Sequence, residues 1–378
     1  MSFRKILFWS HLVAGIATGL VILLLAITGV LLTYEHQLIN AAESTYDVTV
    51  SDASALPADR LAEIALAETD GKASALVFQN DDSAAVVATI GRSDKLFLDP
   101  YSGEALGSGP TATEEFFGTV TTLHRWLSLS GRNDTGAMVT GASNLVFGFL
   151  LQSGIYLWLP RIWKWGMLKT KILFRRSYPN AKARDFSWHH VFAFWAAIPL
   201  ILIILSGAVI SYSWASDLVY SAYGEDAPTR RRPGGSQASG PLAIDANGVG
   251  LQAVLDRAIT HESDWTQIKL TLPKGKNADS VSAMVDTGTG RQLTHQTTLT
   301  IAQETGEVVS TSRLSDRSPG MQARMWMRFV HTGEHYGLIG QTIAGLASLF
   351  TVFMVYTGLA LSYRRLIQPL FRPRKSAA

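Results

Sequence analysis

The chain has 378 residues, of which 47% are hydrophobic and 17% charged, a composition too apolar for an ordinary soluble enzyme. It contains no cysteine, which excludes disulfides, thiolate metal sites, iron–sulfur clusters and covalently attached c-type haem. The formal net charge is +3. The basic residues are distributed unevenly, in a way that the membrane spans described below explain, so nucleic-acid binding is not needed to account for them.

Four uncharged windows divide the chain, and each is longer than the roughly 20 residues that a helix needs to cross a bilayer. They predict a membrane α-helical protein with transmembrane helices at 1–34, 135–160, 186–216 and 335–363. The first window is too long for the apolar core of a cleaved signal peptide, which spans about 7–15 residues. We therefore expect it to be a membrane span.

Basic residues concentrate in three short segments. The first ten residues, the loop 161–185 and the tail 364–378 together hold 15 of the 33 Lys and Arg residues and a single acid. Because short cytoplasmic segments are enriched in Lys and Arg, both termini and this basic loop are predicted to be cytoplasmic. The connections 35–134 and 217–334 then form two large periplasmic loops of a multi-pass protein in the bacterial inner membrane.

The two long connections share one pattern. Each contains a helix-like segment, at 57–68 and 251–260, followed by runs that alternate apolar and polar residues. This pattern predicts a small α+β module with an antiparallel sheet in each connection. The first connection also ends in a juxtamembrane helix. The stretch 227–241, rich in Arg, Pro, Gly and Ser, predicts a flexible insertion in the second.

The two halves of the sequence repeat one order of landmarks. His11 precedes Gly29 by 18 residues, and His189 precedes Gly207 by the same interval, which is five helical turns. The later correspondences are His124 with His331, Ser153-Gly154 with Thr357-Gly358, and the turn at 98–104 with the turn at 302–307. This order predicts an internal duplication, with the insertion at 227–241 lengthening the second copy.

Seven of the nine histidines lie at or near the ends of the predicted spans. They are His11, His189 and His190 at the cytoplasmic end, and His36, His124, His331 and His335 at the outer end. An ionisable group at membrane depth is costly, so a functional role is the default hypothesis, although a single imidazole can also reach toward headgroups. Two neutral imidazoles from two helices suit the axial ligation of a haem. Gly15, one turn after His11, leaves room for a flat ring.

Three alternatives remain open at this point. His331 and His335 form H-x-x-x-H, which on a helix would suit zinc or iron. The protein could instead be a cofactor-free envelope sensor or scaffold whose outer modules bind peptides. A metal permease would need polar groups near the bilayer midplane, for which Asn144 and Gln152 are the candidates.

The motifs around the histidines resemble those of the PepSY-associated transmembrane family. They are L-H-R-W-L at 123–127, W-H-H-V-F-A at 188–193 and H-T-G-E-H-Y-G-L-I-G-Q at 331–341, with [ST]-G in each span and D-P-x-S-G-E in the outer module. More narrowly, the chain is similar to inner-membrane ferric-siderophore reductases of the FoxB type, which act in ferrioxamine use. The resemblance implies an oxidoreductase that carries electrons through haem b and reduces ferric siderophore, Fe3+ to Fe2+, in the periplasm to release iron.

Carried onto this sequence, the resemblance implies two haems b, one ligated by His11 and His189 at the cytoplasmic face and one by His124 and His331 at the outer face. Relatives tend to have W-H-R where this chain has Trp188-His189-His190. We assign His189 because it keeps the 18-residue register of the first half. Further candidates are His36, His190 and His335 as spare imidazoles, Arg125 and Arg328 beside the haem propionates, and a quinone or a cytoplasmic reductant as electron donor.

Overall fold

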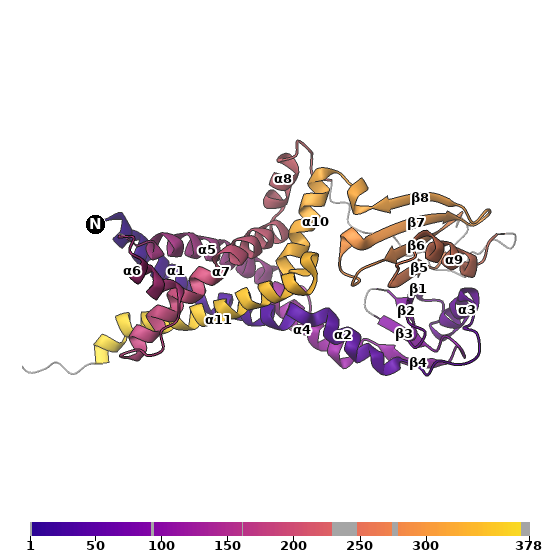
Figure 1. Cartoon of the computed structure of the whole chain (residues 1–378), viewed down its shortest axis with the longest axis horizontal. Helices are drawn as coiled ribbons and strands as arrows, with labels where there is room; N and C mark the ends of the chain where they lie inside the picture. Colours follow the sequence, from indigo (N-terminus) through magenta and orange to yellow (C-terminus); the bar gives the residue numbers. More distant parts are fainter. Residues whose placement is uncertain (1, 92–93, 161, 229–247, 274–278, 372–378) are drawn as a thin grey trace, which may run out of the picture. The chain divides into compact units, whose positions relative to one another are not determined.

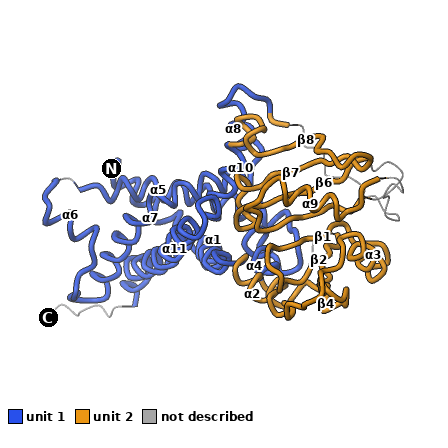
Figure 2. The backbone as a smooth tube through the Cα atoms, turned by 45° about the vertical axis from the view of Figure 1, so that its right-hand side comes forward, with its two compact units in different colours: residues 1–35, 117–226, 323–378 blue, residues 36–116, 227–322 orange. Residues whose placement is uncertain are grey.

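A computed structural model describes residues 2–91, 94–160, 162–228, 248–273 and 279–371 of the chain (Figure 1). The chain forms two compact units. Unit 1 comprises residues 1–35, 117–226 and 323–378, and unit 2 comprises residues 36–116 and 227–322 (Figure 2). The expected insertion at 227–241, apart from its first two residues, and the end of the basic tail lie outside the described residues.

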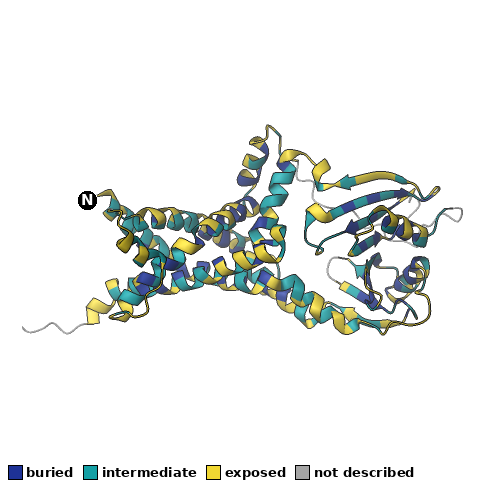
Figure 3. Cartoon of the chain, viewed as in Figure 1, coloured by how far each residue is buried: buried dark blue, intermediate teal, exposed yellow. Residues whose placement is uncertain are grey.

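Four long helices form the body of unit 1. They are α1 (Phe3–Leu31), α5 (Asp134–Trp158), α7 (Ala181–Ser211) and α11 (Gly337–Leu366). Each is long and apolar enough to cross a membrane, which confirms the four predicted spans. α1 and α7 each pack against both α5 and α11. Apolar side chains on the outside of these helices stay exposed, as expected where lipid replaces water (Figure 3).

Shorter helices flank the four spans. They are α4 (Ala112–Trp126), α6 (Trp165–Ile172), α8 (Ser213–Ser221), α10 (Pro319–Thr332), η1 (Leu32–Tyr34), η5 (Glu334–Tyr336) and η6 (Gln368–Phe371). α4 leads into α5 and α10 into α11, each through a close backbone approach at a glycine. A Cβ on Gly136 would lie 1.7 Å from the Trp126 carbonyl oxygen, and one on Gly340 would lie 2.3 Å from that of Gly333. No larger residue fits at either turn.

The turn at Gly333 argues against the hypothesis that His331 and His335 bind a metal ion from one helix. Gly333 has φ +80°, a left-handed conformation that ends α10 at Thr332 and directs the chain into η5. His331 therefore lies on α10 and His335 on η5. The H-x-x-x-H spacing does not place both imidazoles on one helical face.

Unit 2 contains one eight-stranded antiparallel sheet with the order β4-β3-β2-β1-β5-β6-β7-β8. The strands are β1 (Ala73–Gln79), β2 (Val86–Ile90), β3 (Asp94–Leu98), β4 (Ala105–Gly109), β5 (Gln267–Thr271), β6 (Ser280–Asp286), β7 (Gln296–Ala302) and β8 (Val308–Arg313). The antiparallel sheet is confirmed. The two sheets expected from the sequence are joined into one, because β1 pairs with β5 and so leaves neither strand as an edge.

Helices α3 (Ala58–Glu68) and α9 (Leu251–His261) pack on one face of this sheet. They share an apolar core with Leu76, Leu270 and Leu299, all fully buried. The remaining helices of this part are α2 (Glu35–Glu43), η2 (Ser44–Tyr46), η3 (Leu293–His295) and η4 (Leu314–Asp316). The two packed helices cap each other. Asp59 Oδ1 accepts from the Leu251 backbone N–H at 2.7 Å, and Gln252 Oε1 accepts from that of Ala58 at 2.8 Å.

Replacing Leu270 tests whether the joined sheet is one core. Leu270→Ala removes a fully buried side chain from β5, where it stands opposite Leu76 of β1. We expect a loss of about 2–5 kcal/mol in the free energy of unfolding of this unit, the range for large-to-small core substitutions. Thermal unfolding of the detergent-purified chain measures it. The neighbouring exposed Thr271→Ala is the control, and an equal effect of both substitutions would contradict the prediction.

Candidate functional site

Four histidines of unit 1 each form a hydrogen bond with a hydroxyl group on a neighbouring helix. The Nδ1–oxygen distances are 2.8 Å for His11 to Ser153, 2.7 Å for His124 to Thr28, 3.1 Å for His189 to Thr357 and 3.0 Å for His331 to Ser206. These contacts tie α1 to α5, α4 to α1, α7 to α11 and α10 to α7. We call each pair of side chains a histidine clamp.

The hydroxyl groups fix the protonation of the imidazoles. Each hydroxyl donates its only proton to the carbonyl four residues earlier in its own helix, at 2.6–2.7 Å, so its contact with Nδ1 requires the ring to donate. His189 Nδ1 also lies 3.0 Å from the Met354 carbonyl, and His331 Nδ1 lies 3.0 Å from the Ile203 carbonyl. A carbonyl can only accept. Each of the four rings therefore carries a proton on Nδ1, and its neutral form leaves a lone pair on Nε2.

A glycine follows each clamp hydroxyl and lies against the imidazole. A Cβ added to Gly154, Gly358 or Gly207 would lie 3.3–3.4 Å from Cε1 of the clamped histidine, and one on Gly29 would lie 3.8 Å away. The [ST]-G motif thus has two functions, since the hydroxyl binds the ring nitrogen and the glycine lets the ring approach the helix. The sequence has an [ST]-G dipeptide in each predicted span, but it did not reveal that one such dipeptide in each span serves a histidine on another helix.

The clamped histidines form two pairs. His11 interacts electrostatically with His189, and His124 interacts with His331. Burial, together with His331 and Arg125, lowers the pKa of His124 to about 4, and burial lowers the pKa of His331. Both shifts favour the uncharged form of the His124 and His331 imidazoles. Within the described residues the Nε2 atoms of all four rings accept no hydrogen bond.

The other candidate histidines lie in different surroundings. His190 Nδ1 donates to the Phe186 carbonyl of its own helix at 2.7 Å. The ring of His335 meets the edges of Tyr336 and Trp326, with centroids 4.7 and 6.3 Å away. His36 belongs to unit 2, where its Nε2 donates to the Thr289 carbonyl at 2.7 Å. None of the three is clamped by a hydroxyl of a neighbouring span. No cluster of three His, Cys, Asp or Glu side chains suited to a bare metal ion occurs in the described part of the chain.

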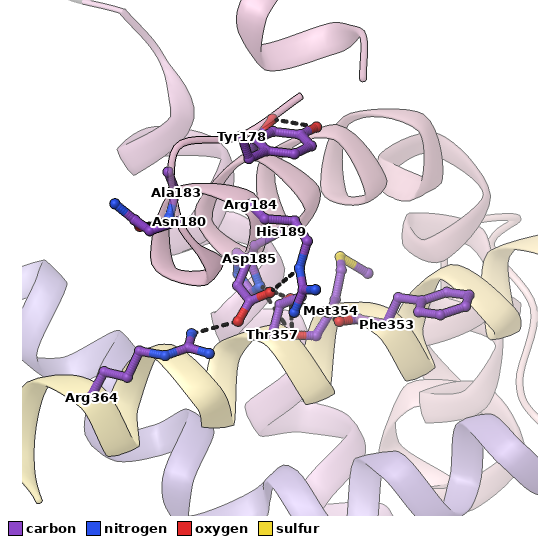
Figure 4. A network of polar contacts seen from close by, with 11 residues as sticks. Tyr178, Asn180, Ala183, Arg184, Asp185, His189, Phe353, Met354, Thr357 and Arg364 are labelled. Atoms are coloured by element: carbon purple, nitrogen blue, oxygen red, sulfur yellow. Dashed lines mark hydrogen bonds and ion pairs between the residues drawn. The ribbon is translucent and has the colours of Figure 1, made fainter. Parts of the chain in front are cut away.

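Cationic side chains accompany both pairs. Beside His189, the fully buried Asp185 accepts from Arg184 Nε at 2.9 Å and from Arg364 of α11, which leaves one net positive charge (Figure 4). Near His124, burial lowers the pKa of Arg125, and the charge of Arg328 contributes to the shift. These two guanidinium groups lie over Trp126 and Phe329, and neither forms an ion pair with a described residue.

The glycine expected to leave room near His11 has a different environment. A Cβ on Gly15 would meet only Leu150 of α5, at an ordinary contact distance of 3.9 Å. Gly15 therefore lies in the α1–α5 interface, and the glycines that face the imidazoles are those of the [ST]-G motifs.

These features define a class: a four-span membrane protein with clamped histidine pairs in its helical unit and a second unit built on an antiparallel sheet. The family described as PepSY-associated TM region matches residues 8–365, and the chain belongs to this family. None of the curated proteins compared with the chain matches it.

The ion pair of Asp185 supplies a stability test. Asp185→Ala leaves Arg364 without its buried partner. We therefore expect the free energy of unfolding to fall by about 3 kcal/mol. This is the lower end of the range for buried ion pairs, because Arg184 is partly exposed. Arg184→Ala, which keeps the buried contact, should cost under about 1 kcal/mol. Thermal unfolding in detergent compares the two variants. The double variant Asp185→Ala with Arg364→Ala should recover part of the loss, and its failure to do so would contradict the pairing.

Proposed function

We propose that this protein carries electrons across the bacterial inner membrane through haem b and reduces a ferric siderophore in the periplasm. The observation that carries the proposal is the set of four imidazoles whose Nδ1 donates to a clamp hydroxyl, an arrangement that leaves Nε2 of the neutral ring able to bind a metal. Histidines that bind metals characteristically donate their other ring proton to a fixed acceptor, which sets the tautomer and orients the ring.

The pairs fit the axial ligation of haem better than they fit a bare metal ion. Two imidazoles suffice for a haem iron, because the porphyrin supplies the other four ligands. His11 with His189 would hold one haem, and His124 with His331 the other. The glycine beside each ring removes side-chain bulk, and Arg125 and Arg328 carry charges suited to propionates. When bound, haem supplies one-electron oxidation and reduction, while the protein supplies position and tuning.

The charges of the loops predict which histidine pair lies on the cytoplasmic side. The positive-inside rule assigns the His11 and His189 pair to the cytoplasmic side and the His124 and His331 pair to the periplasmic side. Electrons would therefore move from a donor at the basic end toward an acceptor outside. A ferric siderophore would be a suitable acceptor, because reduction of its iron to the softer ferrous ion weakens binding by hard oxygen ligands and releases the iron. The resemblance to ferrioxamine reductases supports the same substrate class.

An internal duplication explains why the clamps come in matched sets. The clamp of His11 and Ser153 corresponds to that of His189 and Thr357, in the order in which these residues repeat along the sequence. The clamps of His124 and His331 correspond in the same way. In unit 2, α3 with β1–β4 and α9 with β5–β8 have the same order of elements. We propose that these are two copies of a PepSY-like module.

A second candidate function is a cofactor-free envelope sensor or scaffold whose PepSY-like modules bind peptides. The observation that favours it is an apolar cavity of about 370 Å³ in unit 2. Its lining includes Leu56 and Phe78 from the first half of the sheet unit and Leu255 from the second. A cavity of this size and polarity would accept an aliphatic or aromatic peptide side chain. This function requires neither haem nor the histidine clamps.

An absorption spectrum of the detergent-purified protein, oxidised and then reduced with dithionite, separates the two functions. We expect a sharp reduced α band and two haems per chain by pyridine haemochrome assay. His11→Ala and His331→Ala should each remove one haem, because each deletes one axial ligand. His261→Ala, an exposed histidine of unit 2, is the control. A colourless protein, expressed with ample haem, would eliminate the reductase mechanism and favour the sensor.

The clamp hydroxyls should affect how tightly the protein retains haem. Ser153→Ala removes the only acceptor that the described residues offer to His11 Nδ1, whereas Thr357→Val leaves His189 its bond to the Met354 carbonyl. We therefore expect Ser153→Ala to weaken haem retention by about 10–100-fold, and Thr357→Val to have a smaller effect. Haem loss to apomyoglobin measures retention. Thr351→Val, a buried threonine of α11 that binds only its own helix, is the matched control. Equal retention in Ser153→Ala and Thr351→Val would contradict the clamp's role.

A further inference from the structure

His190 has an unused acceptor next to a clamped histidine. Its Nδ1 donates to the Phe186 carbonyl, so its Nε2 carries a lone pair, and no described residue donates to that atom. Its ring lies 6.3 Å from that of His189 at an angle of 72°, so the two imidazoles face different surroundings. The clamp of His189 does not use His190.

The first half of the chain shows that the clamp does not require a polar residue here. Leu12 follows His11 as His190 follows His189, and Leu12 is buried. The residue after the clamped histidine is thus a leucine in the first half of the chain and a histidine in the second. An imidazole within a membrane span is costly, so its presence at position 190 calls for a function of its own.

Aromatic side chains surround His190. Phe186 and Phe194 lie one turn before and after it, on the same face of α7. The Phe186 ring is 4.2 Å from the His190 ring, and Phe194 stacks on Trp158 with centroids 5.3 Å apart and planes at 17°. Both phenylalanines are exposed, at 55% and 39%. The face therefore offers flat apolar surface to the bilayer.

Polar groups complete this face. Lys171 is close enough to His190 to interact electrostatically, and its ammonium group lies 5.5 Å above the Trp158 ring while donating to the Trp158 carbonyl. The indole N–H of Trp158 is buried and has no hydrogen-bond partner among the described residues. An acceptor nitrogen, a cation and an unpaired N–H donor therefore occur around one aromatic surface at the basic end of the bundle.

We propose that this face binds a membrane hydroquinone, the electron donor for the function proposed above, on which this inference rests. A hydroquinone combines a flat ring for aromatic stacking with hydroxyl groups that can donate to His190 Nε2, and its apolar tail remains in the bilayer. The described sheet is entirely antiparallel, and the sequence contains no glycine-rich dinucleotide motif between a strand and a helix, so a donor that arrives through the lipid suits this chain.

The protons and electrons released by oxidation of the hydroquinone can all be accounted for. A hydroquinone loses two electrons and two protons as it becomes a quinone. Both protons pass to water at the basic end, while His190 Nε2 accepts the hydrogen bond that positions the hydroquinone hydroxyl. The two electrons would leave singly, one to each of the two haems that the pairs His11 with His189 and His124 with His331 would hold, and each haem iron would be reduced from Fe3+ to Fe2+.

Binding of decylubiquinone to the full-length purified protein tests the site directly. Quenching of tryptophan fluorescence gives the Kd, and stopped-flow absorption gives the rate of haem reduction by decylubiquinol. His190→Leu introduces the residue found at position 12, so the variant should fold and retain haem. We expect its Kd to rise about tenfold, as for loss of one hydrogen bond to a ligand, and its reduction rate to fall by a similar factor. His190→Gln, which keeps an acceptor, should bind within about threefold of the parent protein.

Leu202→Ala, an exposed position on another face of α7, is the matched control and should change neither quantity. Equal Kd values for the parent protein and His190→Leu would overturn the proposal. Unchanged reduction by decylubiquinol in His190→Leu would also overturn it, because the quinol would then react elsewhere. A haem that decylubiquinol does not reduce would indicate a cytoplasmic donor instead. Quinone binding to a protein without haem would overturn the proposed function while leaving the binding site itself supported.

Discussion

The hydrogen bond from an imidazole Nδ1 to a hydroxyl on the next helix is the interaction on which unit 1 depends. A neutral imidazole in an apolar bundle must satisfy its N–H, and in a membrane water is not available to do so. The hydroxyl that accepts this proton has already given its own to the helix backbone, so it cannot reverse roles. One short contact therefore positions the ring, fixes its tautomer and ties two helices together.

The four clamps connect different pairs of helices around the bundle. Two of them join spans directly, α1 to α5 and α7 to α11, and two join the helices that precede spans, α4 to α1 and α10 to α7. The glycine turns at Gly136 and Gly340 bring α4 and α10 back against their spans at distances that only glycine permits. The imidazoles of His124 and His331 are thereby held by a short helix, a tight turn and a span acting together, whereas those of His11 and His189 lie within spans.

Much of this arrangement could be predicted from the sequence, and the remainder could not, for identifiable reasons. Hydropathy and charge predicted the four spans. The equal spacing of His11 to Gly29 and of His189 to Gly207 singled out two of the clamped histidines, and the repeated order of landmarks matched His124 with His331. The partner of each histidine was missed, because spacing along one helix does not reveal which helix packs beside it. The joined sheet was missed for a similar reason, since β1 and β5 lie nearly 200 residues apart and only their pairing connects them. Strands such as β4, with the sequence ALGSG, lack the apolar alternation that would have revealed them.

The four [ST]-G motifs also contain a record of what each position tolerates. In the first half of the chain the clamp of His124 uses a threonine, Thr28, and the clamp of His11 a serine, Ser153. The second half has the reverse arrangement, with Ser206 for His331 and Thr357 for His189. The extra methyl group is therefore accepted at either end of the bundle, provided that the hydroxyl remains. The following residue shows no such freedom and is glycine in all four motifs. Within a single polypeptide, one position of the motif is selected for a functional group and the next for the absence of a side chain.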